Sequence, residues 1–440
     1  MTTDGRRRCV YMHSPDQFGP VTTHTIQRSR NGQDHKTNAG IDGCGDHIGL
    51  HGCLRGGGNG SQSSGEITEL SLWDGFTQYD ENSPWGRLLS GCEEQVGVTL
   101  ERTTDATYAN TLLQSAASGN LPDLAIAENS SIPQFAKAGL LADNETTGLD
   151  ASEQMENVLA SAVYDGKTYG ASVGFNTLAL YYNPDKLAEA GIENPPTTWD
   201  ELREVAAKLT TDDQTGLGFS SIANEDGAFQ FMVFLWGAGG SVTDVDGDGG
   251  VEALTYLKQL IDDGSVSTDV VNWNQQDVRD QYMAGNVAMM LNGTWQLNEL
   301  DKAGVPYAVA PFPGKDGGNA EVPLGGEFIE VIATGNDARQ KKAAEFAQCM
   351  VEPDSMKEWA AGQTYLIPTE AGIAEQAESD PRLEIWAEIA SSARSKAAEL
   401  GPDYPQASLS LQTAFQSVLT GTASPEDAAA KAQAEIESIQ

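Results

Sequence analysis

Histidine is absent from most of this chain. All five histidines of the 440 residues lie within residues 1–55, so residues 66–440 contain none. Ser-His-Asp and Cys-His catalytic systems, and metal sites built on histidine, are therefore excluded from that part. The chain also lacks a Walker-type phosphate loop and a Gly-x-Gly-x-x-Gly fingerprint, so no nucleotide-binding loop is indicated.

Basic residues are scarce as well. The chain has 26 Lys and Arg against 64 Asp and Glu, a formal net charge of −38. Nucleic acid or an anionic membrane surface would repel such a protein, and we expect no nucleic-acid partner. No segment of residues 66–440 has the roughly 18 consecutive apolar residues that a membrane span needs. The acidity by itself indicates a soluble, non-adhesive exterior.

The first 55 residues have a composition unlike the rest. They hold all the histidines and three of the five cysteines, and they show neither apolar periodicity nor the apolar core of a signal peptide. Their His and Cys spacing matches no zinc pattern. A Gly/Ser tether, Gly56–Gly65, follows. We expect residues 1–65 to be a disordered or non-native segment with its tether, and residues 1–55 to be dispensable.

One short segment in this region is typical of exported lipoproteins. Leu50–Cys53 ("LHGC") has the leucine and small-residue spacing that precedes a lipid-carrying cysteine, but the apolar run upstream is missing. We interpret residues 1–55 as standing in place of the native signal.

An acidic stretch, Asp244–Gly250 ("DVDGDGG"), matches the start of a calcium-binding loop. The twelfth position of such a loop should be a bidentate Glu, and here it is Thr255. We therefore interpret the stretch as an acidic turn before a helix. We expect neither a metal ion nor a cofactor.

Strand and helix patterns alternate from residue 67 to residue 141, which predicts a parallel sheet with helices on its faces. Ligands of such sheets bind beyond the carboxyl ends of the strands. Trp73–Phe76 and Glu128-Asn129 stand at two of these ends. A helix is predicted to begin after Thr198, because Glu201 follows three residues later as in a capping box.

The segment Met283–Leu297 ("MAGNVAMMLNGTWQL") raises a question of function. Its apolar run predicts a buried strand, and Asn292-Gly293 predicts a turn after it. Trp295 then follows at the tip. Its indole either packs on the protein's own core or forms a wall for a ligand.

Several collinear segments resemble the solute-binding proteins of carbohydrate ABC importers, the maltose-binding-protein class. They include "GNLPDLAIAENSSIPQFAKAGLLAD", "LALYYNPDKLAEAGIENPPTTWDEL", "YMAGNVAMMLNGTWQL" and "AAGQTYLIPTEAGI". The resemblance spans about residues 66–440. It implies an α/β fold of two lobes, each a mostly parallel sheet flanked by helices, closing over a sugar in the cleft between them.

The resemblance also implies lobe boundaries. Residues 66–175 with 312–368 would form the N-terminal lobe, and residues 176–311 with 369–440 the C-terminal lobe. Hinge strands would cross between the lobes near Asn176, Pro311 and Pro368.

The resemblance and the strand ends together give a set of ligand-binding candidates and no catalytic residue. Trp295 occupies the position whose ring stacks on a sugar in relatives, and a pyranose face suits an aromatic ring. Core packing stays open for Trp73 and Phe229, and a structural bulge stays open for Gly325 and Gly326. The candidates are Trp73, Asp74, Phe76, Glu128, Asn129, Asn176, Phe229, Trp295, Gly326 and Glu327. Trp236 is interpreted as core.

Two departures from the family bear on the ligand. Maltodextrin binders carry aromatic rings where this chain has Ala127 and Leu411, so two walls of an extended groove would be missing. Few Lys or Arg neighbour the motifs, which disfavours an anionic sugar. We expect a small neutral sugar of galactose or glucose type, either a monosaccharide or the end of a short oligosaccharide.

The resemblance implies an extracellular, membrane-anchored lipoprotein, monomeric, that delivers its ligand to the permease subunits of an ABC importer. Two other functions stay open, a glycoside hydrolase using Glu128 and Glu327 as its carboxylate pair and an adhesin-like surface module.

Cys92 and Cys349 are the only cysteines after residue 55. The family fold would bring their helices to one lobe, and we predict a disulfide between them.

Overall fold

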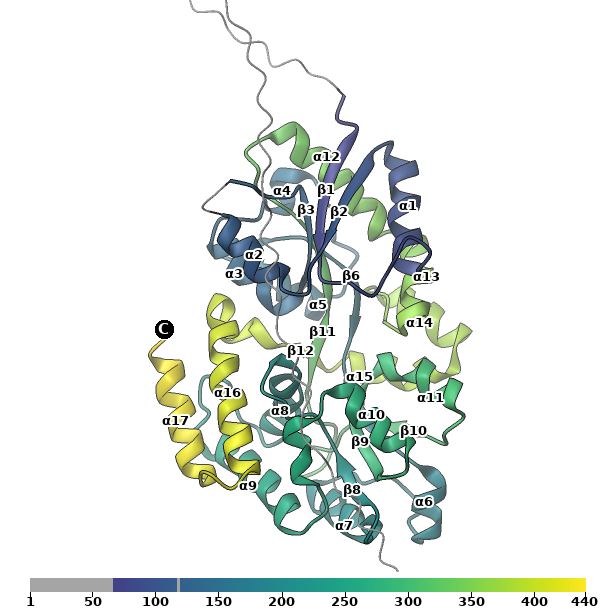
Figure 1. Ribbon diagram of the computed structural model, residues 1–440, viewed down its shortest axis with the longest axis vertical. Coiled ribbons are helices and arrows are strands. Elements are labelled where there is room, and N and C mark those ends of the chain that lie inside the picture. The colour runs from purple at the N-terminus through teal and green to yellow at the C-terminus, as the bar shows by residue number, and fades with distance from the viewer. Residues whose placement is uncertain (1–65, 117–118) are drawn as a thin grey trace, which may run out of the picture. The chain divides into compact units, whose positions relative to one another are not determined.

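The computed structural model describes residues 66–116 and 119–440, and its elements are labelled in Figure 1. The predictions for residues 1–65 lie outside this range. One sheet of six strands has the order β12-β11-β3-β1-β2, with β6 paired to β11. β1, β2 and β3 are parallel, whereas β11 runs antiparallel to β3 and β6. The strands are β1 (Glu69–Asp74), β2 (Thr99–Thr104), β3 (Leu124–Glu128), β6 (Ala171–Asn176), β11 (Val322–Val331) and β12 (Ala393–Ser395).

A second sheet has the order β10-β7-β9-β8. Only β8 and β9 are parallel, and β7 runs antiparallel to both β9 and β10. The expectation of a mostly parallel sheet is therefore wrong for this one, in which two of the three strand pairings are antiparallel. The strands are β7 (Leu178–Tyr182), β8 (Thr215–Gly218), β9 (Val287–Gly293) and β10 (Ala308–Ala310), and a separate hairpin pairs β4 (Val163–Tyr164) with β5 (Lys167–Thr168).

Most strands of each sheet come from one of the expected lobe ranges, which remain a prediction. β6 ends at Asn176 in the first sheet, and β7 begins the second sheet two residues later. β12 differs, since it pairs in parallel with β11 of the first sheet although it belongs to the range 369–440.

Helices connect the strands in the order that the sequence pattern predicts, and α1 and α12 lie side by side next to the first sheet (Figure 1). The α-helices are α1 (Pro84–Val96), α2 (Tyr108–Ser115), α3 (Ile132–Lys137), α4 (Asn144–Thr147), α5 (Glu156–Leu159), α6 (Pro184–Glu189), α7 (Trp199–Leu209), α8 (Glu225–Gly237), α9 (Asp248–Asp262), α10 (Gln275–Met283), α11 (Leu297–Ala303), α12 (Asp337–Met350), α13 (Pro353–Gln363), α14 (Glu370–Ser379), α15 (Glu384–Ala390), α16 (Tyr404–Leu419) and α17 (Pro425–Glu437). The 3-10 helices are η1 (Asn129–Ser131), η2 (Ala160–Ala162), η3 (Thr268–Asn272), η4 (Thr294–Gln296), η5 (Pro381–Leu383), η6 (Lys396–Ala398) and η7 (Gly401–Asp403).

Two predicted helix starts are confirmed. The Thr198 side chain caps α7 by accepting a hydrogen bond from the Glu201 N–H at 3.1 Å. The Glu201 carboxylate accepts from the N–H of Thr197, one residue earlier than in a capping box. The acidic stretch Asp244–Gly250 precedes and begins α9. Across the described residues, no group of three or more His, Cys, Asp or Glu side chains is arranged for a metal ion.

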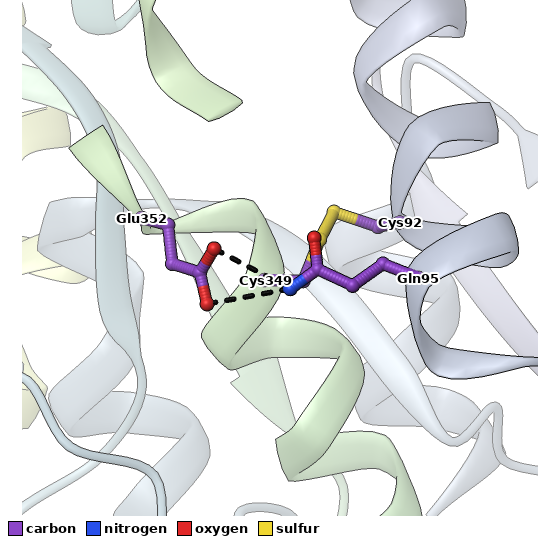
Figure 2. Close-up of a disulfide and its surroundings, with 4 residues drawn as sticks. All are labelled: Cys92, Gln95, Cys349 and Glu352. Carbon is purple, nitrogen blue, oxygen red and sulfur yellow. Dashed lines mark hydrogen bonds between the residues drawn. A yellow bond between two sulfur atoms is a disulfide. The ribbon is translucent and has the colours of Figure 1, made fainter. Parts of the chain in front are cut away.

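The two cysteines form the predicted disulfide (Figure 2). Cys92 on α1 and Cys349 on α12 have Cα atoms 5.7 Å apart, within the range that a disulfide can bridge. Beside the bond, the Gln95 amide donates to the Glu352 carboxylate of the loop after α12. The bond therefore joins two helices that pack next to the first sheet.

None of the helices described here has the length and apolarity to cross a bilayer.

Candidate functional site

A cavity of about 340 Å³ brings together residues of distant segments. Its lining includes residues from β3 and β11 of the first sheet, and from α8, α10 and η4 of the part that contains the second sheet. Seven of the ten predicted ligand-binding residues line it: Phe76, Glu128, Asn176, Phe229, Trp295, Gly326 and Glu327.

Trp295 reaches this cavity because of an unusual strand end. β9 continues through Asn292 and Gly293, so the predicted Asn-Gly turn is wrong. Asn292 is fully buried and its Nδ2 donates to the Gln275 carbonyl at 2.9 Å, which keeps the strand extended. A Cβ on Gly293 would lie 2.1 Å from the Trp295 ring. The missing side chain therefore allows the indole to lie against its own backbone and face the cavity.

Phe229 stands beside Trp295, with ring centroids 6.4 Å apart. The prediction left Phe229 open between ligand stacking and core packing; Phe229 is buried and also lines the cavity, so ligand stacking stays a prediction. Trp236, further along α8, is buried and does not line the cavity, which agrees with its interpretation as core.

A second aromatic wall escaped the sequence analysis. Tyr79, Trp359 and Tyr365 line the cavity together with Phe76. The ring centroid of Trp359 lies 5.3 Å from that of Phe76 and 5.4 Å from that of Tyr79. Tyr365 belongs to the "AAGQTYLIPTEAGI" segment, which carries part of the family resemblance. This resemblance was the one signal in the sequence that could have identified Tyr365 as a site residue. Trp295 is therefore accompanied by more aromatic rings than we predicted.

Ala127 and Leu411, where maltodextrin binders were expected to carry aromatic rings, lie away from the cavity. Ala127 and Leu411 are both fully buried in the core, and neither lines the cavity. Their size therefore does not set the length of the cavity.

The Gly325-Gly326 pair serves the packing of β6 against β11. Gly326 has φ +114°, and a Cβ there would lie 2.5 Å from the Gly174 carbonyl oxygen. The close approach supports the structural interpretation of these glycines, and Glu327 follows them at the cavity wall.

Three predicted site residues do not line the cavity. Trp73 is half-buried and packs against the core. Asn129 is fully buried, and its Nδ2 donates to the Leu324 carbonyl of β11 at 2.9 Å. Asp74 is fully buried and pairs with Arg102, which donates from Nε at 2.6 Å and from Nη2 at 2.9 Å. These residues occupy strand ends, but their side chains are used to join segments of the first lobe.

The role of Asp74 can be tested by a neutral substitution. Asp74→Asn removes the partner of the largely buried Arg102 guanidinium, and breaking such a pair costs about 3–5 kcal/mol of unfolding free energy. Denaturant unfolding would measure this loss. The control is Glu358→Gln, which breaks the exposed Arg87–Glu358 pair and should cost less than about 1 kcal/mol. Unchanged stability with lost ligand binding would instead make Asp74 a direct ligand contact.

A buried lysine is the second feature that the sequence did not reveal. Lys396 of η6 is 2% exposed, and its Nζ lies 2.7 Å from Glu128 and 2.9 Å from Glu225. The Nζ also lies 4.8 Å from the centroid of the Phe229 ring. Burial acts to lower the pKa of Lys396, but the two carboxylates outweigh it and hold the pKa above its usual value. This cation is already neutralised and leaves no charge free for an anionic ligand.

Two further carboxyl groups of the cavity have raised pKa values. Burial, and next the Glu128 carboxylate, raise the pKa of Glu327 to about 8, against the opposing effects of a Tyr365 hydrogen bond and of Lys396. Burial and the neighbouring Glu225 raise the pKa of Asp226, while Lys396 lowers it.

Comparison with known proteins identifies the family. Residues 88–385 match the bacterial extracellular solute-binding proteins. A binding protein of Brucella abortus is 27% identical over 296 residues, covering 64% of this chain and 71% of the relative. A maltooligosaccharide ABC transporter solute-binding lipoprotein of Streptococcus pneumoniae is 24% identical over 285 residues, covering 61% of this chain and 65% of the relative.

Solved structures agree with this fold. A Thermotoga lettingae ABC transporter solute-binding protein bound with alpha-D-tagatose is 26% identical with a TM-score of 0.72, covering 84% of this chain and 99% of that one. Maltose-bound MalE3 of T. maritima is 19% identical with a TM-score of 0.75, covering 85% of this chain and 100% of that one. The chain belongs to the bacterial extracellular solute-binding protein family and has its two-lobed α/β fold. It is therefore a binding protein rather than an enzyme, and the hydrolase alternative is not supported.

Proposed function

We propose that this chain is a sugar receptor of an ABC importer and that it holds its ligand in the described cavity, between the two lobes. The observation that carries the proposal is the pair of aromatic walls. Trp295 and Phe229 form one, and Phe76, Tyr79 and Trp359 form the other. Aromatic faces suit the C–H groups of a sugar ring. The names of the relatives support the same class of ligand, since one binds maltooligosaccharide and another structure contains tagatose.

The ligand that we propose is a small neutral sugar, a monosaccharide or one end of a short oligosaccharide. The cavity volume of about 340 Å³ is near the lower limit of typical small-molecule sites, which range over roughly 300–1,000 Å³. Amide side chains at its wall, among them Gln78, Gln275 and Gln363, both donate to and accept from hydroxyl groups. The single lysine is paired with two carboxylates, so an anionic sugar would meet net repulsion.

Calorimetric titration with sugars of increasing length tests this proposal. We expect galactose, glucose, tagatose or maltose to bind, and affinity to stop rising beyond two rings because the cavity is filled. A thermal-shift panel of the same sugars should raise the melting temperature, since a ligand of the native state stabilises it. Affinity that climbs through four or more glucose units would overturn the proposed size. Absence of binding to every sugar of the panel would contradict the sugar receptor itself and favour a surface interaction module.

In the cell we propose that the receptor is a monomer anchored by a lipid outside the membrane, where it delivers sugar to permease subunits. The Streptococcus pneumoniae relative, named as a lipoprotein of an ABC transporter, supports this arrangement.

A further inference from the structure

Two carboxyl groups of the cavity stand directly opposite each other. Glu327 of β11 and Glu128 of β3 are paired residues of an antiparallel ladder, and both line the cavity. Opposed residues of such a ladder have Cβ atoms about 4.5–5.5 Å apart, and like charges at this position are unfavourable. Two ionised carboxylates would therefore repel each other in a partly shielded site.

The partners of the two carboxyl groups differ. Glu128 accepts hydrogen bonds from the Lys396 ammonium at 2.7 Å, from the Ser130 N–H at 3.0 Å and from the Ser130 hydroxyl. Glu327 has no cation of its own, and its Oε2 is shielded from solvent without a hydrogen-bond partner. An ammonium group therefore compensates the negative charge directly at Glu128, whereas burial and Glu128 outweigh the Tyr365 hydrogen bond and the Lys396 charge that favour ionised Glu327.

We propose that Glu327 is a protonated carboxylic acid at neutral pH and that it determines specificity by donating a hydrogen bond to a ligand oxygen that can only accept. Ring and bridging oxygens of a sugar are such acceptors, whereas a hydroxyl can both donate and accept. A neutral ligand brings no cation that would favour ionisation of Glu327 on binding. This inference rests on the proposed sugar-receptor function and names one recognition contact within it.

Lys396 and the tyrosines around Glu327 keep their charge state near neutral pH. Lys396 stays a cation between its two glutamates. Burial raises the pKa values of Tyr79, Tyr108 and Tyr365, so these phenols stay neutral. Glu225, which is bound to Lys396, lies at the α8 end of the cavity. Asp226 lies there too, and its pKa is raised from the acidic value of an ordinary aspartate.

Histidine, the side chain that normally titrates near pH 7, is absent from residues 66–440.

The pKa of about 8 for Glu327 is consistent with its proposed proton. Because this pKa is raised, the acid is protonated below about pH 8 and ionised above it. Ligand affinity should therefore be full at pH 7 and should decrease as pH rises through 8. If only the protonated form binds, the loss between pH 7 and pH 9.5 is about 30-fold.

Calorimetric titration of the full chain at several pH values from 7 to 9.5 tests the inference, with whichever of maltose, tagatose, glucose or galactose binds most tightly as the probe. Glu327→Gln has the same shape and donates at every pH. Its affinity should remain within about threefold of the wild type at pH 7 and should be independent of pH, because an amide carries no titrating proton. Glu327→Ala should lose about tenfold at pH 7, the contribution of one hydrogen bond.

Glu330→Gln is the matched control. Glu330 lies on the same strand and is fully buried without hydrogen-bond partners, but it does not line the cavity. This variant should keep the pH profile of the wild type. Melting temperatures of all variants, measured at each pH, separate a loss of fold from a loss of affinity.

Three results would overturn the inference. They are parallel pH profiles of wild type and Glu327→Gln, a large loss of affinity in Glu327→Gln at pH 7, and an affinity that rises with pH. If no sugar binds to the wild type, the proposed function fails and this inference fails with it. Infrared difference spectra of wild type against Glu327→Gln give a ligand-free readout. The band of a protonated carboxyl group should be present at pH 7 and absent at pH 9.5.

Discussion

Trp295→Ala should lower sugar affinity by about 30-fold or more while the protein keeps its fold. Aromatic anchors in binding sites commonly contribute 2 kcal/mol or more. Trp295 lines the cavity and is only partly buried, so its removal exposes little of the core. Calorimetry and thermal melting of the same sample would measure both effects.

Trp236→Ala is the control for this experiment. Trp236 lies on α8 at 5% exposure and away from the cavity lining, so its loss should cost about 3–5 kcal/mol of unfolding free energy. The opposite pattern, in which Trp295→Ala destabilises the fold by a similar amount and leaves affinity unchanged, would assign Trp295 to the core.

Loss of the disulfide should lower the stability of the fold substantially. The Cys92–Cys349 bond joins residues separated by 257 positions, so it constrains a long part of the unfolded chain. The double variant Cys92→Ser, Cys349→Ser should lose about 2–5 kcal/mol of unfolding free energy. Neither cysteine lines the cavity, and ligand affinity should remain unchanged.

A reductant separates this effect from the substitutions themselves. Dithiothreitol should lower the melting temperature of the wild type and leave that of the double variant unchanged. Titration of two free thiols at these positions in the unreduced, denatured protein would contradict the disulfide.

Local patterns in the sequence predicted most of the first sheet and the start of α7. Strand and helix alternate with the periods that these elements require, and Thr198 satisfies a backbone donor that the helix itself leaves free. The segment containing Trp295 was also informative. Both its resemblance to the family and its position after a buried strand indicated that Trp295 lies at a binding site.

The remainder of the site could not be predicted because it depends on contacts between distant segments. Lys396 pairs with Glu128 and Glu225, which precede it by 268 and 171 residues. Asp74 stands at a strand end as a ligand-binding residue would, yet Arg102 of the neighbouring strand occupies its carboxylate. A strand end indicates which residues are near a cavity, but the packing of other segments decides which side chains enter it.

The contact between Trp295 and Gly293 bears on engineering this site for other ligands. The backbone at Gly293 has φ −109°, which any residue can adopt, and the three atoms nearest to a Cβ there all belong to the Trp295 indole. The two positions are therefore not independent variables. A library that replaces Trp295 by smaller residues should also vary position 293, because the space released by the ring is where a new side chain can grow. Alanine at 293 should damage the protein with Trp295 and be tolerated without it, a non-additive pair.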